Sequence, residues 1–332
     1  MRGFVPLIAV ATNACSAEAG DLPYGRVDSP VVYGHDSRVA PSALESQAAQ
    51  AVLVNSTLAV VPVSFTTQSR SGSFTISAPM AAEVFDLCSS EPGGQLPAAA
   101  VCTGVAVAAN VVATAAHCVA DQEQCDRLLL VRGFLWDSWQ SDVPADSVFR
   151  CQRVLFRRYH DCSAADLALI EIDRPLAAFA GLAELSPKPG ERLIACGASF
   201  GAPIRCDPEA TVTTTTSSGV SLAADVAIGA SGGPVLDATG DLVGVLSVGA
   251  EDLVPLATCS VEATGSGHGI ERAESADAIR AALALAGGSK EGSDPSGDWS
   301  VACTVSPKPQ PQCSASAVGA AAGWWQPWII AA

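Results

Sequence analysis

The sequence is poor in basic and in aromatic residues, and both shortages limit what the protein can bind. Lysine and arginine together number 18 against 34 aspartates and glutamates, so the formal net charge is −16. Binding of nucleic acid relies on a basic face, so this balance argues against a nucleic acid partner. The six tryptophans are not interleaved with basic residues, so they do not indicate a stacking surface. The composition is typical of a soluble chain that repels its own copies, and we expect a monomer.

The sequence also lacks any Cys-x-x-Cys pair, so we expect no cysteine-rich zinc site, no other metal and no cofactor. It nevertheless holds 12 cysteines, which is a high number for a reducing cytosol. The cysteines therefore indicate an oxidising compartment and a set of disulfides. Closely spaced cysteines favour local bridges, namely Cys151–Cys162, Cys196–Cys206 and Cys303–Cys313, but spacing alone does not fix the pairing.

The apolar run near the N-terminus is too short to span a membrane as a stable helix. Within residues 1–20, Arg2 precedes this run and small residues follow it, which is the pattern of a secretory signal peptide. Residues 13–15 also resemble a bacterial lipobox, so a lipoprotein signal is an alternative, and loss or lipidation of Cys15 leaves eleven other cysteines. We expect a protein that is secreted, extracellular or held on the bacterial cell envelope.

Alternation of helices with strands is absent from the middle of the chain, which excludes a parallel α/β sheet. Short runs rich in Val, Leu, Ile and Thr are separated by Gly, Pro, Asn and Asp from residue 31 onward. This pattern predicts an all-β sandwich or pair of barrels over residues 31–286. One helix is predicted over Glu271–Ala286, where Gly287 and Gly288 end it.

Residues 287–332 form a low-complexity linker followed by an apolar tail that Gln326 and Pro327 interrupt. We expect the linker to be flexible. The tail fits a membrane or surface anchor as well as it fits an ordinary apolar end. Contact with a membrane is therefore expected only through this tail or through a lipid on Cys15.

Three polar residues in apolar or glycine-rich surroundings suggest nucleophilic catalysis. Ser231 stands among glycines, where a tight turn is the simpler explanation, since glycine adopts positive φ at no steric cost. A serine becomes a nucleophile when an oriented base takes its proton. His117 follows an apolar run, and Asp166 begins another, where its carboxylate needs a hydrogen-bond partner such as an imidazole. A disulfide between Cys102 and Cys118 would hold this imidazole in place.

The motifs "TAAHC", "DLALI" and "GASGGP" occur in this order and resemble the chymotrypsin/trypsin superfamily of serine peptidases. The resemblance implies two antiparallel β-barrels, with a cleft between them. It implies that Ser231 is the nucleophile, His117 the general base and acid, and Asp166 the orienting carboxylate. The backbone N–H groups of Gly229 and Ser231 would form the oxyanion hole. An α/β-hydrolase is excluded, because its triad follows the order Ser, Asp or Glu, His.

Local features resemble a bacterial secreted branch related to the glutamyl endopeptidases, among them "VVYGHDSR" and "GVLSVGAEDLV". By the same resemblance, Asp225 stands at the floor of the P1 pocket, where trypsin-like enzymes use an Asp to select Arg or Lys. The alternative stays open that Asp225 confers no basic specificity, as in bacterial relatives that carry an Asp at this place. The residues Ser247, Val248 and Gly249 resemble the strand that pairs with substrate backbone. Ala230 replaces the aspartate that binds a newly cut N-terminus in trypsin-like enzymes, so we expect no activation by that route.

Together these observations predict a secreted serine endopeptidase that acts on a protein or peptide substrate through an acyl-enzyme. Two alternatives stay open. One is a catalytically weak or inactive binding module with the protease fold at the cell surface, and the other is an esterase that uses the same triad.

Overall fold

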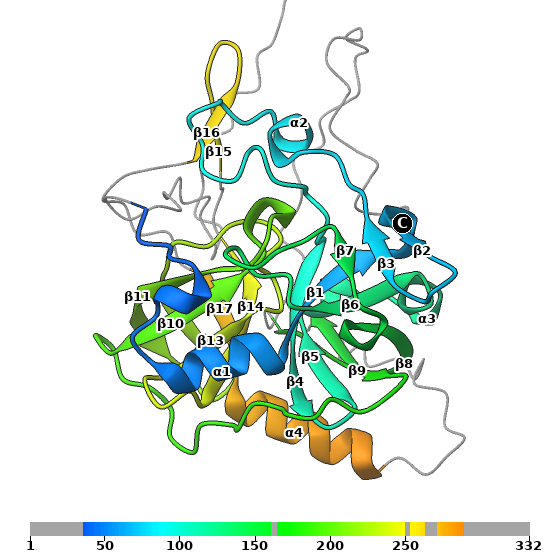
Figure 1. Ribbon diagram of the computed structural model, residues 1–332. Coiled ribbons are helices and arrows are strands. Elements are labelled where there is room, and N and C mark those ends of the chain that lie inside the picture. The colour runs from blue at the N-terminus through cyan, green and yellow to red at the C-terminus, as the bar shows by residue number, and fades with distance from the viewer. Residues whose placement is uncertain (1–35, 161–164, 250–252, 263–270, 289–332) are drawn as a thin grey trace, which may run out of the picture.

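The computed structural model describes residues 36–160, 165–249, 253–262 and 271–288, and two closed six-stranded antiparallel barrels form its body (Figure 1). The first barrel runs in the order β1, β4, β5, β9, β8, β6, which are Thr57–Pro62, Cys102–Ala108, Val111–Thr114, Ala165–Ile172, Val148–His160 and Leu128–Arg132. The second runs β10, β11, β12, β17, β14, β13, which are Arg192–Gly197, Arg205–Thr215, Gly219–Ala223, Glu271–Ser275, Leu242–Val248 and Pro234–Leu236. The all-β, two-barrel prediction is confirmed.

Strand β1 explains why the sequence reads as continuous apolar runs rather than as alternating ones. Successive side chains of a strand point to opposite faces of the sheet. Leu58 and Val60 lie in the core of the first barrel, whereas Ala59 and Val61 join a core shared with the second barrel. Both faces of the strand are therefore buried, and the apolar run has no polar alternation.

Two helices pack against the barrels (Figure 1). Helix α1 spans Gln47–Asn55 and buries Ala49 and Leu53. Helix α4 spans Ala276–Gly288 and buries Ile279 and Ala282 in the core shared by both barrels. None of the helices in the described residues is long and apolar enough to cross a membrane.

The predicted helix over Glu271–Ala286 is wrong in its first turn. Residues Glu271–Ser275 form β17, which pairs with both β12 and β14 and closes the second barrel. The composition of these five residues suits a helix, but pairing on two sides overrides that preference. The helix begins after Ser275, whose hydroxyl accepts the N–H of Ala278 at 3.2 Å as an N-cap does.

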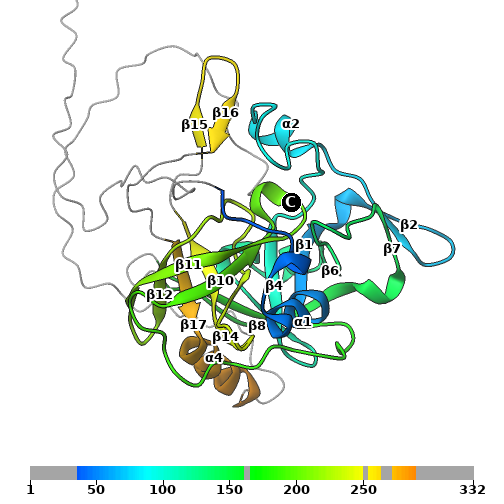
Figure 2. The ribbon, with the colours of Figure 1, turned by 60° about the vertical axis from the view of Figure 1, so that its left-hand side comes forward.

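Smaller elements surround the barrels. They are α2 (Ala81–Phe85), α3 (Gln122–Cys125), β2 (Thr66–Gln68), β3 (Phe74–Ile76), β7 (Asp142–Val143), β15 (Leu253–Pro255), β16 (Ser260–Glu262) and single 3₁₀ turns at Pro41–Ala43, Val63–Phe65, Ala116–Cys118, Ala145–Ser147 and Ser199–Gly201. The β15–β16 hairpin lies beside α2 in both views (Figures 1 and 2), and the backbone of Leu87 bridges to Ser260.

The described residues contain four disulfides: Cys88–Cys259, Cys102–Cys118, Cys125–Cys151 and Cys196–Cys206. Two of them, Cys102–Cys118 and Cys196–Cys206, are pairs that the sequence analysis predicts. The prediction of Cys151–Cys162 is wrong, because α3 packs against β8 and brings Cys125 to Cys151. The predicted signal peptide, the tail after residue 288 and the Cys303–Cys313 bridge lie outside the described residues.

Candidate active site

His117 and Asp166 are brought together by two neighbouring strands of the first barrel. His117 lies in the turn that follows β5, and Asp166 is the second residue of β9, which pairs with β5. The Asp166 carboxylate accepts the backbone N–H of His117 at 2.9 Å and lies 2.6 Å from its Nδ1. With Nδ1 as the donor, Nε2 is left to accept a proton from a substrate or nucleophile. Asp166 is 2% exposed, so its charge is screened little by water.

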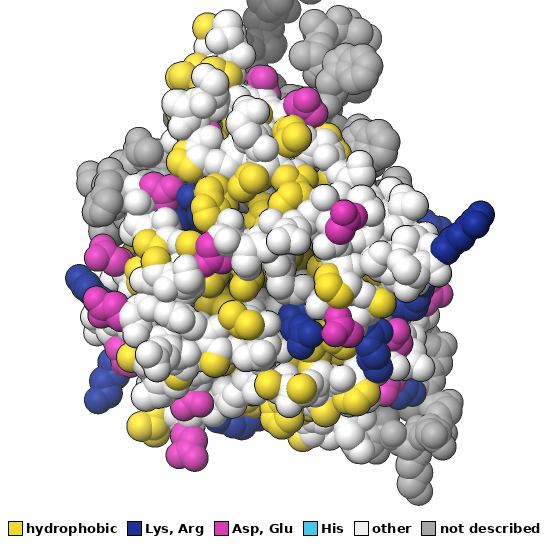
Figure 3. All heavy atoms as spheres, in the orientation of Figure 1, with side chains coloured by type: hydrophobic (Ala, Val, Ile, Leu, Met, Phe, Trp, Pro, Cys, Tyr) yellow, Lys and Arg dark blue, Asp and Glu magenta, His cyan; other side chains and the backbone are white. Residues whose placement is uncertain are grey.

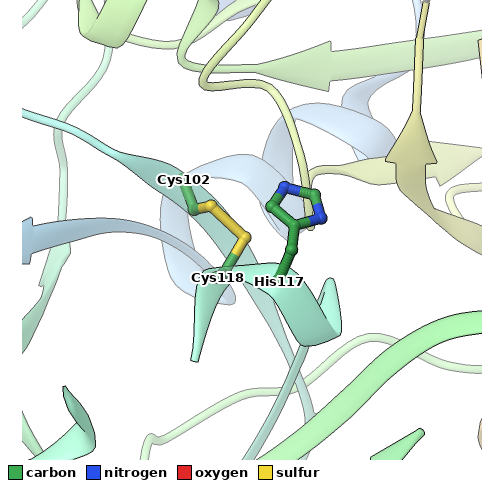
Figure 4. A group of neighbouring side chains, drawn as sticks. All are labelled: Cys102, His117 and Cys118. Atoms are coloured by element: carbon green, nitrogen blue, oxygen red, sulfur yellow. A yellow bond between two sulfur atoms is a disulfide. The ribbon is translucent and has the colours of Figure 1, made fainter. Parts of the chain in front are cut away.

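The Cys102–Cys118 disulfide lies directly beside the imidazole, as Figure 4 shows. The two sulfur atoms and a ring nitrogen of His117 lie within 4.8 Å of one another. A thiolate is the form of cysteine that binds metals, and these two sulfurs are bonded to each other. This group of residues therefore holds the turn around His117 and does not offer a metal site.

Ser231 belongs to the second barrel, but its backbone packs against the first. Its carbonyl accepts the N–H of Thr103 on β4 at 2.8 Å and lies 3.9 Å from Sγ of Cys118, the residue after His117. Ser231 is half-buried. Among the described residues, its hydroxyl makes no hydrogen bond to His117. Such bonds are often long without substrate and tighten when it binds.

Two backbone N–H groups of the serine loop are left without an acceptor in the described part of the chain. The N–H groups of Ala230, Gly232 and Gly233 donate to the carbonyls of Ala227, Leu246 and Ala230. The N–H groups of Gly229 and Ser231 donate to no group in the described residues. They are the two donors that the resemblance assigns to an oxyanion hole, whose donors must be available to a developing negative charge.

The glycines of the loop are required by close packing as well as by backbone conformation. Gly229 has φ +94°, and a Cβ there would lie 2.4 Å from the carbonyl oxygen of Ala198. Gly232 has φ +79°, and a Cβ there would lie 2.0 Å from the carbonyl oxygen of Thr103. The loop is thus clamped between β4 of one barrel and the segment after β10 of the other. The sequence indicated the glycines but could not indicate these neighbours.

Asp225 is 1% exposed and is held by the segment that precedes the first barrel. Its Oδ2 accepts both the backbone N–H of Ser37, at 2.8 Å, and the Ser37 hydroxyl, at 2.7 Å. Its own N–H donates to Asp207 Oδ2 at 2.8 Å. Burial, with Asp225 nearby, raises the pKa of Asp207 despite the hydrogen bonds it accepts. The Asp225 carboxylate is therefore engaged inside the protein.

The segment carrying Ser37 is anchored by further buried contacts. Val39 exchanges two backbone hydrogen bonds with Cys206, at 2.7 and 3.0 Å. The Arg38 side chain is 1% exposed and pairs with Asp36 and with Glu262 on β16. Sequence reasoning missed Ser37 and Asp207. Asp207 could have been found as Asp166 was, because it is an acidic residue within a strand.

Ser247 and Val248 end β14, and Gly249 follows it. The Ser247 hydroxyl donates to the carbonyl of Arg272 on β17 at 3.1 Å. Val248 is 50% exposed and pairs with Arg272 on β17. Gly249 is exposed, and a Cβ there would lie 2.3 Å from the Glu271 carboxylate.

The two barrels, with an imidazole–carboxylate pair on one and a serine loop on the other, have the architecture of the chymotrypsin-like double-barrel fold. The family model of the trypsin-like peptidase domain matches residues 102–245. Together with the two barrels, this match supports the chymotrypsin/trypsin-like superfamily of serine peptidases for these residues.

Solved structures that the chain resembles include a Glu endopeptidase in complex with MPD, at 16% identity and a TM-score of 0.46, covering 76% of this chain and 96% of that one. They include the active form of the Rv3671c protease from M. tuberculosis, at 17% identity and a TM-score of 0.45, covering 82% and 96%. They also include an inactivated protease paralogue of the scabies mite, at 17% identity and a TM-score of 0.43, covering 73% and 96%. No curated protein matches the chain.

Proposed function

We propose that the protein is a secreted serine endopeptidase that uses Ser231, His117 and Asp166. The observation that carries the proposal is the His117–Asp166 pair, 2.6 Å apart, beside a serine loop in which two N–H groups donate to no group of the described residues. Asp166 holds the imidazole with Nε2 directed to accept the proton of Ser231. The Ser231 oxygen then attacks the peptide carbonyl, and His117 returns the proton to the leaving amine.

The N–H groups of Gly229 and Ser231 stabilise the negative charge that develops on the carbonyl oxygen by donating hydrogen bonds to it. Each such donor is worth about 10²–10³ in rate. Water, activated by His117 in the same way, hydrolyses the acyl-enzyme and frees Ser231. No metal or cofactor takes part in these steps.

We further propose that the P1 residue of the substrate is uncharged rather than Lys or Arg. Asp225 is the residue that would bind a cation, and both donors of Ser37 already occupy one of its carboxylate oxygens. A basic P1 side chain would compete with these part-buried hydrogen bonds, each of which costs about 1.5–3 kcal/mol to lose at a charged group. The exposed end of β14, at Val248, supports pairing with an extended substrate.

Secretion and a monomeric state belong to the same proposal. Four disulfides in the described residues suit an oxidising compartment. On the face drawn in Figure 3, basic side chains of the described residues are scattered among acidic and apolar ones, which does not favour a nucleic acid partner.

A binding module with little or no activity is the second candidate, and the missing hydrogen bond between Ser231 and His117 among the described residues is what favours it. A fluorophosphonate probe separates the two. We expect it to label the wild-type protein and not Ser231→Ala, and we expect casein turnover only from the former. Ser221→Ala, a half-buried serine on β12, is the matched control and should keep both properties. Equal labelling of wild type and Ser231→Ala contradicts the endopeptidase.

A further inference from the structure

A second buried carboxylate stands behind the His117–Asp166 pair. Glu274 lies on β17 of the second barrel, whereas Asp166 lies on β9 of the first. Glu274 is 2% exposed, and its Oε1 accepts the backbone N–H of Asp166 at 3.2 Å. This hydrogen bond therefore crosses from one barrel to the other at the residue that orients the imidazole.

The surroundings of Glu274 contain charges of both signs. Nε of Arg272, on the same strand, lies 3.7 Å from Glu274 Oε1, and Arg158 on β8 and the Asp166 carboxylate also act on it. The strands on either side pair it with Gly219 and Val245, which bring no charge. Burial is the main cause that raises the pKa of Glu274, and the charge of Asp166 adds to the rise. Arg272, the hydrogen bond from the Asp166 N–H, and Arg158 oppose the rise.

Burying the Glu274 carboxylate lowers the stability of the fold, and accepting a single N–H is a small return for that cost. Burying an ionised group costs several kcal/mol unless it is paired, and an uncharged amide would accept the same hydrogen bond. The contact with Arg272 is long, so pairing offsets this cost only in part. The negative charge is therefore expected to act on its neighbours.

We propose that Glu274 is a positioning residue for the His117–Asp166 pair. It holds the Asp166 backbone from the opposite barrel, and its charge adds to that of Asp166 in favouring the protonated imidazole of the transition state. The proposal rests on the proposed function, since it assigns Glu274 a part in the same proton transfer. Glu274 itself touches neither substrate nor nucleophile.

Two variants separate the hydrogen bond from the charge. Glu274→Gln keeps an acceptor for the Asp166 N–H and removes the charge, and Glu274→Leu removes both. We expect the acid limb of kcat/KM to move about 0.5–1 pH unit to lower pH in Glu274→Gln, because losing the charge makes His117 harder to protonate. We expect Glu274→Leu to lower kcat about tenfold or more and to leave KM within twofold of wild type. In Glu274→Gln, which keeps the acceptor, kcat should be largely recovered.

Glu262→Gln is the control. It removes another buried carboxylate whose pKa burial raises, but Glu262 pairs with Arg38, away from Asp166. Glu262→Gln should lower the stability of the protein and leave the acid limb of kcat/KM at its wild-type pH. The proposal is overturned if Glu274→Gln leaves the acid limb unmoved, or if its effects match those of Glu262→Gln. If Glu274→Leu does not fold, the proposal is tested by the position of the acid limb of kcat/KM in Glu274→Gln.

A readout that needs no activity keeps this test separate from that of the endopeptidase. NMR titration of the imidazoles in the Ser231→Ala protein, assigned with His117→Gln, follows the protonation of His117 directly. Adding Glu274→Gln should move the midpoint of that titration to lower pH, and an unmoved midpoint refutes the role of Glu274. A wild-type protein that does not react with fluorophosphonate contradicts only the endopeptidase, because this titration still gives its answer.

Discussion

Gly229→Ala should distort the serine loop, because the protein around Gly229 leaves no room for a side chain. The new Cβ would lie 2.4 Å from the carbonyl oxygen of Ala198 and 2.9 Å from the nitrogen of Gly201. Ordinary contacts begin at 3.4 Å, so the loop or its neighbour must move by about 1 Å. The positive φ of +94° adds a backbone cost of about 1–3 kcal/mol.

A shift of this size moves the Gly229 N–H out of line with the oxyanion. A displacement near 1 Å costs about 10² in rate, and loss of one donor costs about 10²–10³. We therefore expect kcat/KM to fall at least about 10²-fold on a peptide substrate. The backbone cost should also lower Tm by about 2–12 °C, at about 2–4 °C per kcal/mol for a domain of this size.

The control for backbone strain is Gly190→Ala. Gly190 has φ +85°, but a Cβ there has nothing within 4 Å. It should lower Tm by a few degrees and leave kcat/KM within twofold of wild type. If Gly229→Ala and Gly190→Ala retain the same activity, the N–H of Gly229 does not stabilise the transition state and the oxyanion assignment fails.

Two further variants test the carboxylates that Ser37 joins. Asp225→Asn should leave the P1 preference for uncharged residues in place in a peptide-library profile and should lower Tm, because Oδ2 is already held by Ser37; a tenfold change in the ratio of basic to uncharged P1 cleavage would contradict this. Asp207→Asn tests pH dependence: burial raises the pKa of Asp207, so its stabilising effect is full below the unfolded pKa and declines as pH rises through the folded pKa. Urea denaturation should thus show a smaller stability difference between wild type and Asp207→Asn at pH 7 than at pH 4.5, and a larger difference at pH 7 would refute the sign.

The fold was predictable because its signals are local. Runs of β-branched residues between turn residues predict strands, and strands such as β1 are short and apolar on both faces. Where a local signal competes with a distant partner, the prediction fails. Residues 51–55 read as the start of a strand, but they end helix α1, which Ser46 caps and Leu53 anchors in the core. Glu271–Ser275 read as helix, but the barrel needs a sixth strand there.

Some residues of the candidate site were likewise predictable from local sequence, and others were not. His117, Asp166 and Ser231 stand in recognisable motifs, and the structure brings the first two into contact and the third beside them. Ser37 stands in the "VVYGHDSR" stretch, which assigns it no partner, and Glu274 stands in no motif. Their positions depend on contacts across 188 and 108 residues, which only the folded chain establishes. The bridge Cys88–Cys259, which spans 171 residues, escaped prediction for the same reason.

Each barrel is built from one continuous stretch of chain, since the strands of the first end at Ile172 and those of the second begin at Arg192. During synthesis, His117 and Asp166 are therefore added to the chain before Ser231. The strand that carries Glu274 emerges later still and closes the second barrel. A chain that stops before Ser231 thus carries two of the three residues proposed for catalysis and lacks the third.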